Sequence, residues 1–315
     1  MKNNLHVFLG ATVADAAARP LHWVYNQKKL NKYIKGKKDF TFLKKNKSPF
    51  YNIKTGKVSG YNDIGQVMFL TLIEGNKNIE ERFKKNIIKN FGPGSLYWKN
   101  YNLRAKYRKV KDWRGIIKGP WIHQNIIETI KNIKIKRKLT GGKKVNESDG
   151  YCAALPYFLY GHNLKSLKKI ISIVTISKIS LKYALAKLCL IDLALKGSKN
   201  PIEEFTLRFK KDRYFKSVVE GIKKVKKLKT KPHPIIVKKL GMACSYPGTF
   251  ESSIHAIINS SNYKTAILRT IKGGGCNCSR VNFIGAYFAA LKGFKSIPIK
   301  WINKTFAAKK ILSQN

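Results

Sequence analysis

Apolar residues in the second half of the chain recur at the three- and four-residue spacing of amphipathic helices. This spacing marks the segments 151–161, 164–177, 180–196, 201–210, 213–226 and 249–258, and a last long helix that carries Val281, Ile284, Phe288 and Leu291. Side chains on one face of an α-helix repeat every 3.6 residues, so each segment has one face to bury. Alternating strand patterns are nearly absent, and there is no internal repeat. The sequence therefore predicts an all-α fold, a single globular multi-helix bundle over residues 1–315.

The first half of the chain has shorter signals of the same kind. Helices are predicted over residues 4–17, 67–74, 80–90 and 122–133. Arg19-Pro20 ends the first of them, because proline cannot continue a helix. Residues 92–121 are predicted to form an ordered loop with aromatic anchors, and a polar loop is expected over 140–150.

The composition indicates a globular protein without a membrane anchor. The chain has 315 residues, of which 43% are hydrophobic, and this is enough for a substantial core. No segment approaches the ~20 uncharged apolar residues that span a bilayer, and the N-terminal residues show no signal-peptide pattern. Five scattered cysteines are too few and odd in number for a disulfide scaffold. We therefore expect a cytoplasmic protein with reduced thiols and no membrane partner.

The formal net charge of +48 raises the question of a nucleic-acid partner. Only ten of the 64 basic residues are arginine, and the lysines are spread along the whole chain. Proteins that read nucleic acids favour arginine at base edges and concentrate their charge. We favour compositional drift with a solvated lysine surface, while a selected polyanion-binding role stays open. Both interpretations predict non-specific nucleic-acid binding at low salt.

The 16 acidic residues are informative because they are few, and none follows Glu251. Asp15 lies on the small-residue face of the first predicted helix. It could orient a substrate hydroxyl or cap a neighbouring helix N-terminus, and we favour a buried structural carboxylate. His22 follows, beside Trp23. A histidine in that position is either a ligand or a packed, hydrogen-bonded side chain.

Two further polar segments precede predicted helices. In Ser59–Gln66, Asp63 and Asn62 lie at a helix start, where a carboxylate can hold a hard cation or orient a water molecule. Ordinary N-cap and turn chemistry explains the same residues equally well. In Asn146–Tyr151, the polar side chains of Glu147 and Asp149 could line the mouth of a pocket, or could simply start the next helix.

The stretch 273–280, Gly-Gly-Gly-Cys-Asn-Cys-Ser-Arg, is the most unusual segment. Glycines before a helix present free N–H groups and a positive dipole end, which suits phosphate. In this interpretation Gly274 and Gly275 bind the phosphate, and Lys272 and Arg280 reinforce the site.

The two cysteines of this stretch, Cys276 and Cys278, leave two other interpretations open. A zinc site needs four ligands, and Cys244 and His255 are the plausible additions to the pair. A redox pair is the third possibility, although no known redox motif surrounds it.

Together, these segments resemble the ADP-ribosylglycohydrolase superfamily, and within it the branch that contains the J-type lens crystallins. Residues 10–25 resemble the family's first motif, Tyr61-Asn62-Asp63 falls where the family has Tyr-Thr-Asp-Asp-Thr, and 147–151 falls where a pocket-lining segment precedes the central helix. Residues 274–280 resemble the family's Gly-Gly-Asp-x-Asp-Ser/Thr, Ser245-Tyr246-Pro247 its Ser-Phe-Pro, and 297–301 its closing Ile-Pro-x-x-Trp. The resemblance extends from about residue 8 to residue 303.

The resemblance implies an orthogonal all-α bundle with a cleft that binds ADP-ribose and two magnesium ions. Several positions depart from the family pattern. Asp63 is kept, but Ile64 and Gly65 replace the family's second Asp and its Thr. Cys276 and Cys278 stand at the two late Asp positions, only Ser279 is kept there, and His22 stands where many members have Glu. A thiol is a poor ligand for magnesium, which prefers hard oxygen.

The resemblance implies a hydrolase of ADP-ribosyl linkages with a degenerate dinuclear metal site. The first alternative is a non-catalytic protein that binds ADP-ribose or a nucleotide, or has a crystallin-like structural role; the second is a basic polyanion-binding protein. Whether the protein is an enzyme is left open. The expected partner is an ADP-ribose-like small molecule or an ADP-ribosylated protein. The candidate residues are Asp63 and Asp149 for catalysis, Asp15, His22, Asn62, Gly274, Gly275 and Arg280 for substrate binding, and Asp63 with Ser279 for metal.

Overall fold

The computed structural model describes residues 4–75, 77–107 and 115–314, and it confirms the all-α prediction. The helices of the first half are α1 (Leu5–Ala18), α2 (Gln27–Ile34), α3 (Gly60–Ile73), α4 (Ile79–Phe91), α5 (Leu96–Tyr107), α6 (Gln124–Lys134) and α7 (Asp149–Leu159). Those of the second half are α8 (Leu164–Val174), α9 (Lys178–Leu195), α10 (Pro201–Arg208), α11 (Lys216–Lys227), α12 (His233–Leu240), α13 (Gly248–Ile258), α14 (Tyr263–Gly273), α15 (Asn277–Lys292), α16 (Ile299–Lys304) and α17 (Ala308–Leu312).

The remaining regular elements are short. The strands β1 (Tyr51–Asn52) and β2 (Ile117–Lys118) form a parallel pair, and two 3₁₀ turns, η2 (Arg19–Leu21) and η3 (Phe294–Ser296), follow α1 and α15. The strand pair joins the loop before α3 to the segment before α6, which fixes two loops near the site described below.

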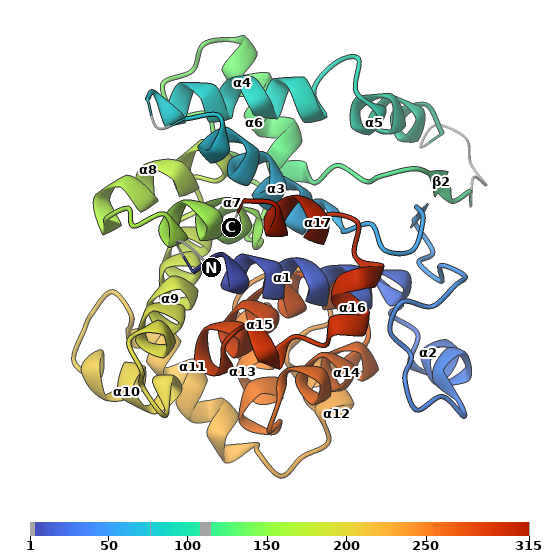
Figure 1. Ribbon diagram of the computed structural model, residues 1–315, viewed down its shortest axis with the longest axis vertical. Coiled ribbons are helices and arrows are strands. Elements are labelled where there is room, and N and C mark those ends of the chain that lie inside the picture. The colour runs from blue at the N-terminus through green and yellow to red at the C-terminus, as the bar shows by residue number, and fades with distance from the viewer. Residues whose placement is uncertain (1–3, 76, 108–114, 315) are drawn as a thin grey trace.

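The centre of the molecule is the pair α1 and α15, which are buried along almost their whole length (Figure 1). The two helices can approach closely because small residues meet at their crossing. A Cβ atom added to Gly10 would lie 2.6 Å from the Gly285 oxygen, and one on Gly285 would lie 2.4 Å from the Gly10 oxygen. The hydroxyl of Tyr263 donates to the Gly10 carbonyl at 2.7 Å and ties α14 to the same crossing.

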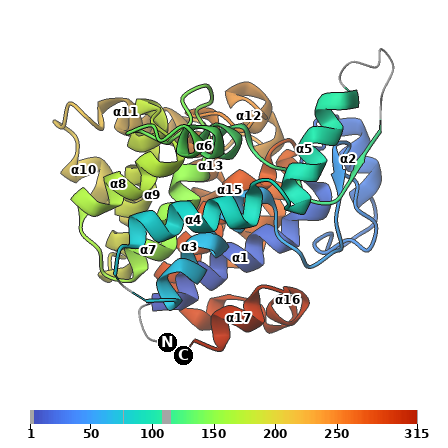
Figure 2. The same ribbon diagram turned by 90° about the horizontal axis from the view of Figure 1, so that it is seen from above.

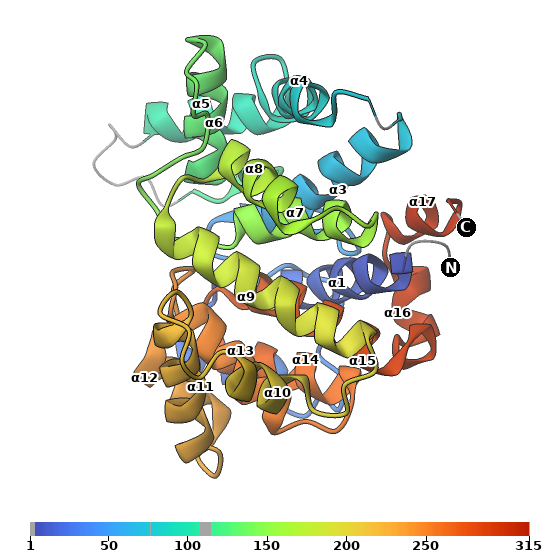
Figure 3. The same cartoon turned by 90° about the vertical axis from the view of Figure 1, so that its left-hand side faces the viewer.

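The other helices surround this pair on opposite sides. Figure 1 shows α3 to α8 above α1 and α10 to α14 below it, and α9 runs between the two groups (Figure 3). Helices α16 and α17 cover one edge, beside both chain ends (Figure 2). Three helices, α3, α7 and α15, begin near the end of α1, and their N-terminal residues form the candidate site.

The structure differs from the sequence prediction in several segments. Helix α3 begins at Gly60, seven residues before the predicted start, so Asp63 lies in its first turn. Helix α5 occupies part of the predicted 92–121 loop; its apolar side chains do not form a single stripe, and this hid it from periodicity. Residues 108–114 of that loop lie outside the described residues. The short helices α2 and α12 were also not predicted.

Within the parts of the chain that the structure describes, no helix is long and apolar enough to cross a bilayer.

Candidate functional site

Asp15 lies at the base of the site, fully buried near the end of α1. Its carboxylate accepts hydrogen bonds from the Ser59 N–H (2.5 Å), the Ser59 hydroxyl (2.6 Å) and the Asn282 amide (2.6 Å). Burial raises the pKa of Asp15, whereas the bonds from Ser59 oppose that rise. Because Ser59 immediately precedes α3, Asp15 caps this helix from a neighbouring element. Both oxygens are occupied, so the geometry matches the structural interpretation rather than contact with a substrate.

Asn62 belongs to the same buried network. Its amide donates to Asn282 at 2.9 Å, and its oxygen accepts from Gln66 at 2.9 Å. Gln66 also donates to Thr12 of α1 at 3.1 Å. The network therefore joins α1, α3 and α15, and Asn62 is engaged with protein groups.

Asp63 faces a different direction. Its carboxylate accepts a hydrogen bond from the Tyr97 hydroxyl of α5, and it lines a cavity of about 450 Å³ with Lys57, Gln66 and Leu96. Burial raises the pKa of Asp63 to about 7, although the bond from Tyr97 opposes the rise and the charge of Asp15 adds to it. Neither late cysteine lines this cavity.

The backbone N–H groups of the glycine turn are all bonded within the protein. Those of Gly274, Gly275 and Cys276 donate to the carbonyl oxygens of Ile271 (3.0 Å), Val24 (2.8 Å) and Met242 (2.9 Å). The sequence-based expectation of free N–H groups for phosphate is therefore wrong for this turn. Glycine is needed at 275 for another reason: its φ is +64° and a Cβ atom would lie 2.3 Å from the Met242 oxygen.

The two cysteines of the turn point apart. The Cys278 sulfur lies 3.9 Å from the Asp15 carbonyl oxygen, and burial raises its pKa well above the usual range. Ser279 donates to the Cys276 carbonyl at 2.8 Å, so its hydroxyl is engaged locally. The proposed partner His255 contacts His233 instead, at 3.0 Å. No set of three potential ligands includes these cysteines among the described residues, which argues against the zinc interpretation.

Cys276 lies in a group with His22 and Cys244. The His22 Nε2 atom is 3.4 Å from the Cys276 sulfur, and its Nδ1 atom is 2.9 Å from the Tyr51 hydroxyl. Trp23, whose ring stacks on His22, donates from Nε1 to the Cys244 sulfur at 3.4 Å. Burial raises the pKa of Cys276, but the hydrogen bond from Cys244 and the charge and hydrogen bond of His22 together bring it well below the usual range. The surroundings therefore favour the thiolate form of Cys276, at a position where the sequence resemblance implies a carboxylate.

Arg280 lies fully buried beside this group. Its guanidinium donates to the Gly274 carbonyl oxygen, and its Nε and Nη1 atoms have no hydrogen-bond partner. Burial lowers its pKa, and the charges that oppose this effect most are those of Cys276 and Cys244. Arg280 was expected to bind a substrate phosphate. It is fully buried against the glycine turn, and its role in substrate binding stays a prediction.

Another acid–base group consists of His123, Glu147 and Asp149. It lies next to Tyr61, at the start of α7. The Asp149 carboxylate is 2.6 Å from His123 Nδ1 and accepts from the Asn125 amide at 3.0 Å. Burial lowers the pKa of His123, but the charge and hydrogen bond of Asp149, with the charge of Glu147, outweigh burial and raise this pKa to about 9. The Tyr61 hydroxyl donates to Glu147 at 3.1 Å, and burial with the charge of Asp149 raises the Glu147 pKa to about 7.

His123 was not among the predicted site residues. It lies just before α6, in a segment read only for helical spacing, and no local motif surrounds it. Lys187 was missed for the same reason. It is fully buried on α9, donates to the Ser148 hydroxyl at 3.1 Å, and burial lowers its pKa to about 7.

The residues at the family's metal positions do not fit two magnesium ions. Asp63 is the only carboxylate there, and the Cys276 and Cys278 sulfurs are soft ligands. His123, Glu147 and Asp149 do bring three potential ligand atoms within 4.8 Å of one another. However, both Asp149 oxygens already accept hydrogen bonds, one from His123 and one from Asn125.

The site reaches the surface through aromatic side chains. The Trp23 ring lies 5.4 Å from Trp121 and 5.6 Å from Phe50, centroid to centroid, and stacks on His22 at 4.2 Å. Phe50 and Tyr25 are each 40% exposed, and Glu147 is half-buried. A run of packed aromatic rings therefore connects the acid–base group to the partly exposed Phe50.

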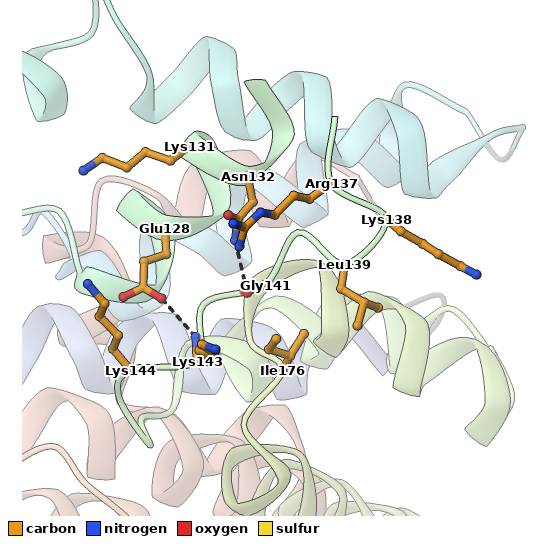
Figure 4. Close-up of a pocket in the computed structure, with 10 residues that line it drawn as sticks. All are labelled: Glu128, Lys131, Asn132, Arg137, Lys138, Leu139, Gly141, Lys143, Lys144 and Ile176. Carbon is orange, nitrogen blue, oxygen red and sulfur yellow. Dashed lines mark hydrogen bonds between the residues drawn. The ribbon is translucent and has the colours of Figure 1, made fainter. Parts of the chain in front are cut away.

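A cavity of about 560 Å³ lies elsewhere, beside α6 (Figure 4). Five cationic side chains line it: Lys131, Arg137, Lys138, Lys143 and Lys144. In Figure 4 the Lys131 and Lys138 side chains extend away from each other, so the cations do not converge on one point. Glu128, the acid of this cavity, accepts from the Lys143 N–H at 3.0 Å.

An all-α bundle with a polar site at the N-termini of α3, α7 and α15 is the arrangement that the sequence resemblance implies. The sequence profile of the ADP-ribosylglycohydrolase family matches residues 4–313, and the chain belongs to this family. Among curated proteins, the chain is 25% identical to crystallin J1A and 24% identical to crystallin J1B of Tripedalia cystophora. Each match covers 96% of this chain and 92% of the crystallin.

A solved structure with a similar fold is described as an ADP-ribosylglycohydrolase-related protein complex. The TM-score is 0.61 at 14% identity, covering 99% of this chain and 95% of the other. At that identity the likeness supports the fold alone.

Proposed function

We propose that this protein binds an ADP-ribose-like ligand in the aromatic-bordered site and does not carry out two-magnesium hydrolysis. The side chains at the positions where the resemblance implies metal ligands are the observation behind the claim that two-magnesium hydrolysis does not occur. Asp63 is bonded to Tyr97, Ile64 is buried and apolar, and thiols replace the two late carboxylates. These groups do not make a site for two hard cations.

Three features support ligand binding. Members of this family act on ADP-ribosylated substrates. Trp121 is half-buried and its neighbour Phe50 is 40% exposed, and an aromatic face stacks on an adenine or any other base. The net charge of +48 attracts the diphosphate from a distance. The crystallin relatives also show that a family member can carry the name of a lens protein rather than of a hydrolase.

The experiment is calorimetric titration of the protein with ADP-ribose in the presence of EDTA. We expect Trp121→Ala to weaken binding about tenfold, since base stacking contributes about 1–3 kcal/mol. Trp98→Ala is the matched control, because Trp98 is also half-buried but packs on Tyr101 of α5. Equal loss in both variants, or no binding to the unaltered protein, would overturn the proposal.

A second candidate function is hydrolysis without a metal, favoured by Glu147. This carboxyl lies beside Asp149, is half-buried, and has a pKa of about 7. Such a group can donate and accept a proton at pH 7. EDTA-resistant release of ADP-ribose from an ADP-ribosylated arginine substrate, lost in Glu147→Gln and kept in Glu128→Gln, would establish it. If neither protein releases ADP-ribose, this candidate is excluded and the binding proposal is untouched.

A further inference from the structure

The cavity that Asp63 lines is separate from the site of Trp23 and Trp121, since neither tryptophan lines it. Five segments of the chain form its walls: the loop before α3, the first turns of α3, the end of α4, the start of α5, and the segment between α16 and α17. Its volume is about 450 Å³, which is within the range of cavities that hold small organic molecules. The molecule therefore has a second place where a small ligand fits.

The polar side chains at the inner end of this cavity offer hydrogen-bond acceptors. The Asp63 carboxylate receives one protein hydrogen bond, from Tyr97 at Oδ2. The Gln66 amide nitrogen donates to side chains of α1 and α3 at 3.1 and 2.9 Å, and the Asn90 amide nitrogen donates to a carbonyl of α4 at 2.8 Å. No described residue donates to Asp63 Oδ1, Gln66 Oε1 or Asn90 Oδ1. A ligand that donates hydrogen bonds is what these atoms can bind.

The ionised Asp63 also has no counter-charge. Several acids on the surface of this lysine-rich chain pair with a lysine or an arginine, as Glu81 and Asp192 do. Asp63 takes part in none of the ion pairs of the described residues, and Lys57, the cation that lines the same cavity, is exposed. A carboxylate held away from bulk water is unfavourable unless it is paired. The cavity therefore has a negative charge for which the protein supplies no partner.

Apolar side chains form the outer part of the cavity. Leu96 and Phe306 line it and are 54% and 48% exposed. The Phe306 N–H donates to the Gly56 carbonyl at 3.0 Å, which fixes the ring's segment against the loop before α3. Large apolar side chains left exposed around a cavity are typical of ligand-binding sites. This part of the cavity suits a hydrocarbon or aromatic group.

We propose that this cavity binds a small organic cation, a protonated amine carried by an apolar body. The ammonium donates to Asp63 Oδ1, with the amide oxygens of Gln66 and Asn90 as further acceptors, and the apolar body packs on Leu96 and Phe306. A compact ammonium has three N–H donors and no acceptor, which matches this set of atoms. A metal ion is not the expected ligand, because Asp63 is the one carboxylate among the described residues that line the cavity.

The inference goes beyond the proposed function, because ADP-ribose and the amine bind in different places. It also runs against the general electrostatics of the molecule. The net charge of +48 attracts anions and repels cations. A preference for a cation therefore reports the local carboxylate and not the overall field.

The test is calorimetric titration of the full-length protein with phenethylamine in EDTA, at pH 8, where Asp63 with its pKa of about 7 is ionised. Two ligands of similar shape are the controls: phenethyl alcohol, which is neutral, and hydrocinnamate, which is an anion. We expect saturable binding of one phenethylamine per chain. Both controls should bind at least about tenfold more weakly, because each loses the charge-assisted hydrogen bond.

Two variants locate the binding. Asp63→Asn keeps the shape of the side chain and removes its charge, so phenethylamine should bind at least about tenfold more weakly and lose its advantage over phenethyl alcohol. Glu74→Gln is the matched control, because Glu74 follows the same helix but does not line the cavity, and it should change nothing. Leu96→Ala, at an exposed position that folding tolerates, should weaken binding about threefold through lost apolar contact.

Two results with the unaltered protein would overturn the proposal. One is the absence of saturable phenethylamine binding at millimolar concentrations. The other is hydrocinnamate binding as tight as that of phenethylamine. Neither depends on whether a variant folds. An equal loss of affinity in Asp63→Asn and Glu74→Gln would also overturn it, since the amine would then bind outside this cavity.

Discussion

Two buried regions lie near the N-terminal turns of α15, and they differ in how completely their charged groups are hydrogen-bonded. Around Asp15, the carboxylate accepts three hydrogen bonds of 2.5–2.6 Å, and all of them come from the protein. Around Cys276, the thiolate is held by soft contacts of 3.4 Å and longer, and the neighbouring Arg280 leaves its Nε and Nη1 atoms unpartnered. The first region is closed by α1, α3 and α15, whereas the second borders the half-buried Cys244.

The difference separates structural from functional roles. Native proteins pair almost all buried polar groups, so a satisfied network is what folding alone produces. Unpaired buried groups next to an opening are found where a ligand or a reaction supplies the missing partner. By this criterion Asp15 and Asn62 hold the bundle together, and Arg280 belongs to the candidate site.

The largest expected effect breaks the closed region. Asp15→Ala should lower the free energy of unfolding by about 4 kcal/mol, because it leaves the Ser59 N–H and hydroxyl buried without their acceptor and removes one of the two acceptors of the Asn282 amide. Urea denaturation measures it. Asp39→Ala is the control: Asp39 also accepts two bonds, from Thr41, but is exposed, and its loss should cost about 1 kcal/mol. Equal losses would show that Asp15 is not a structural anchor.

The next effect concerns the turn that supports Cys276. Gly275→Ala should cost about 2–3 kcal/mol, since it combines a φ of +64° with a Cβ atom 2.3 Å from the Met242 oxygen. Gly161→Ala isolates the conformational part, because Gly161 has a φ of +85° and no neighbour within 4 Å. It should cost about 1 kcal/mol. Thermal unfolding compares the two variants. A Gly275 variant as stable as the Gly161 variant would mean that the loop 242–244 shifts to accommodate the Cβ atom at little cost in free energy.

A smaller effect follows from the pH dependence of Asp63. Its pKa in the folded protein is about 7, above the ordinary value near 4 in the unfolded chain. Between about pH 4 and 7 the unfolded chain releases a proton that the folded protein keeps, so the free energy of unfolding falls as pH rises through that window. Asp63→Asn should remove this part of the slope and make the protein about 1–2 kcal/mol more stable at pH 8, given partial exposure. Denaturation curves at pH 5 and pH 8 test this, and an unchanged slope would contradict the shift.

The sequence was sufficient for what local patterns determine. Helices α4, α6, α8 and α11 were predicted within a few residues, because each carries an apolar stripe of 3.6-residue period. The capping alternative for Asp15 could also be stated, since small residues around it imply a close helix neighbour. The missed helix α5 has no single apolar stripe, so its position is decided by tertiary packing.

The chemistry of the site depends on contacts that a local pattern cannot contain. His22 and Cys276 are 254 positions apart, and Cys278 points away from Cys276. The reason is helical geometry: Cys278 lies two residues into a turn that rotates its side chain toward α1. His123 and Asp149 are 26 positions apart, with helix α6 between them, and no spacing rule predicts that pair.

The smallest expected effect concerns the surface lysines, whose charges, unlike those of the two buried regions, are exposed to solvent. Substituting Lys131, Lys138 and Lys144 together with glutamine should weaken binding to a labelled single-stranded DNA less than about threefold at fixed salt, because three of 64 basic groups are removed and they do not converge. Binding should also fall steeply with salt. Fluorescence anisotropy across a salt series measures both quantities. A loss of about thirtyfold or more, or binding that salt hardly weakens, would make the cavity of Figure 4 a specific anion site. It would then favour the polyanion-binding interpretation over compositional drift.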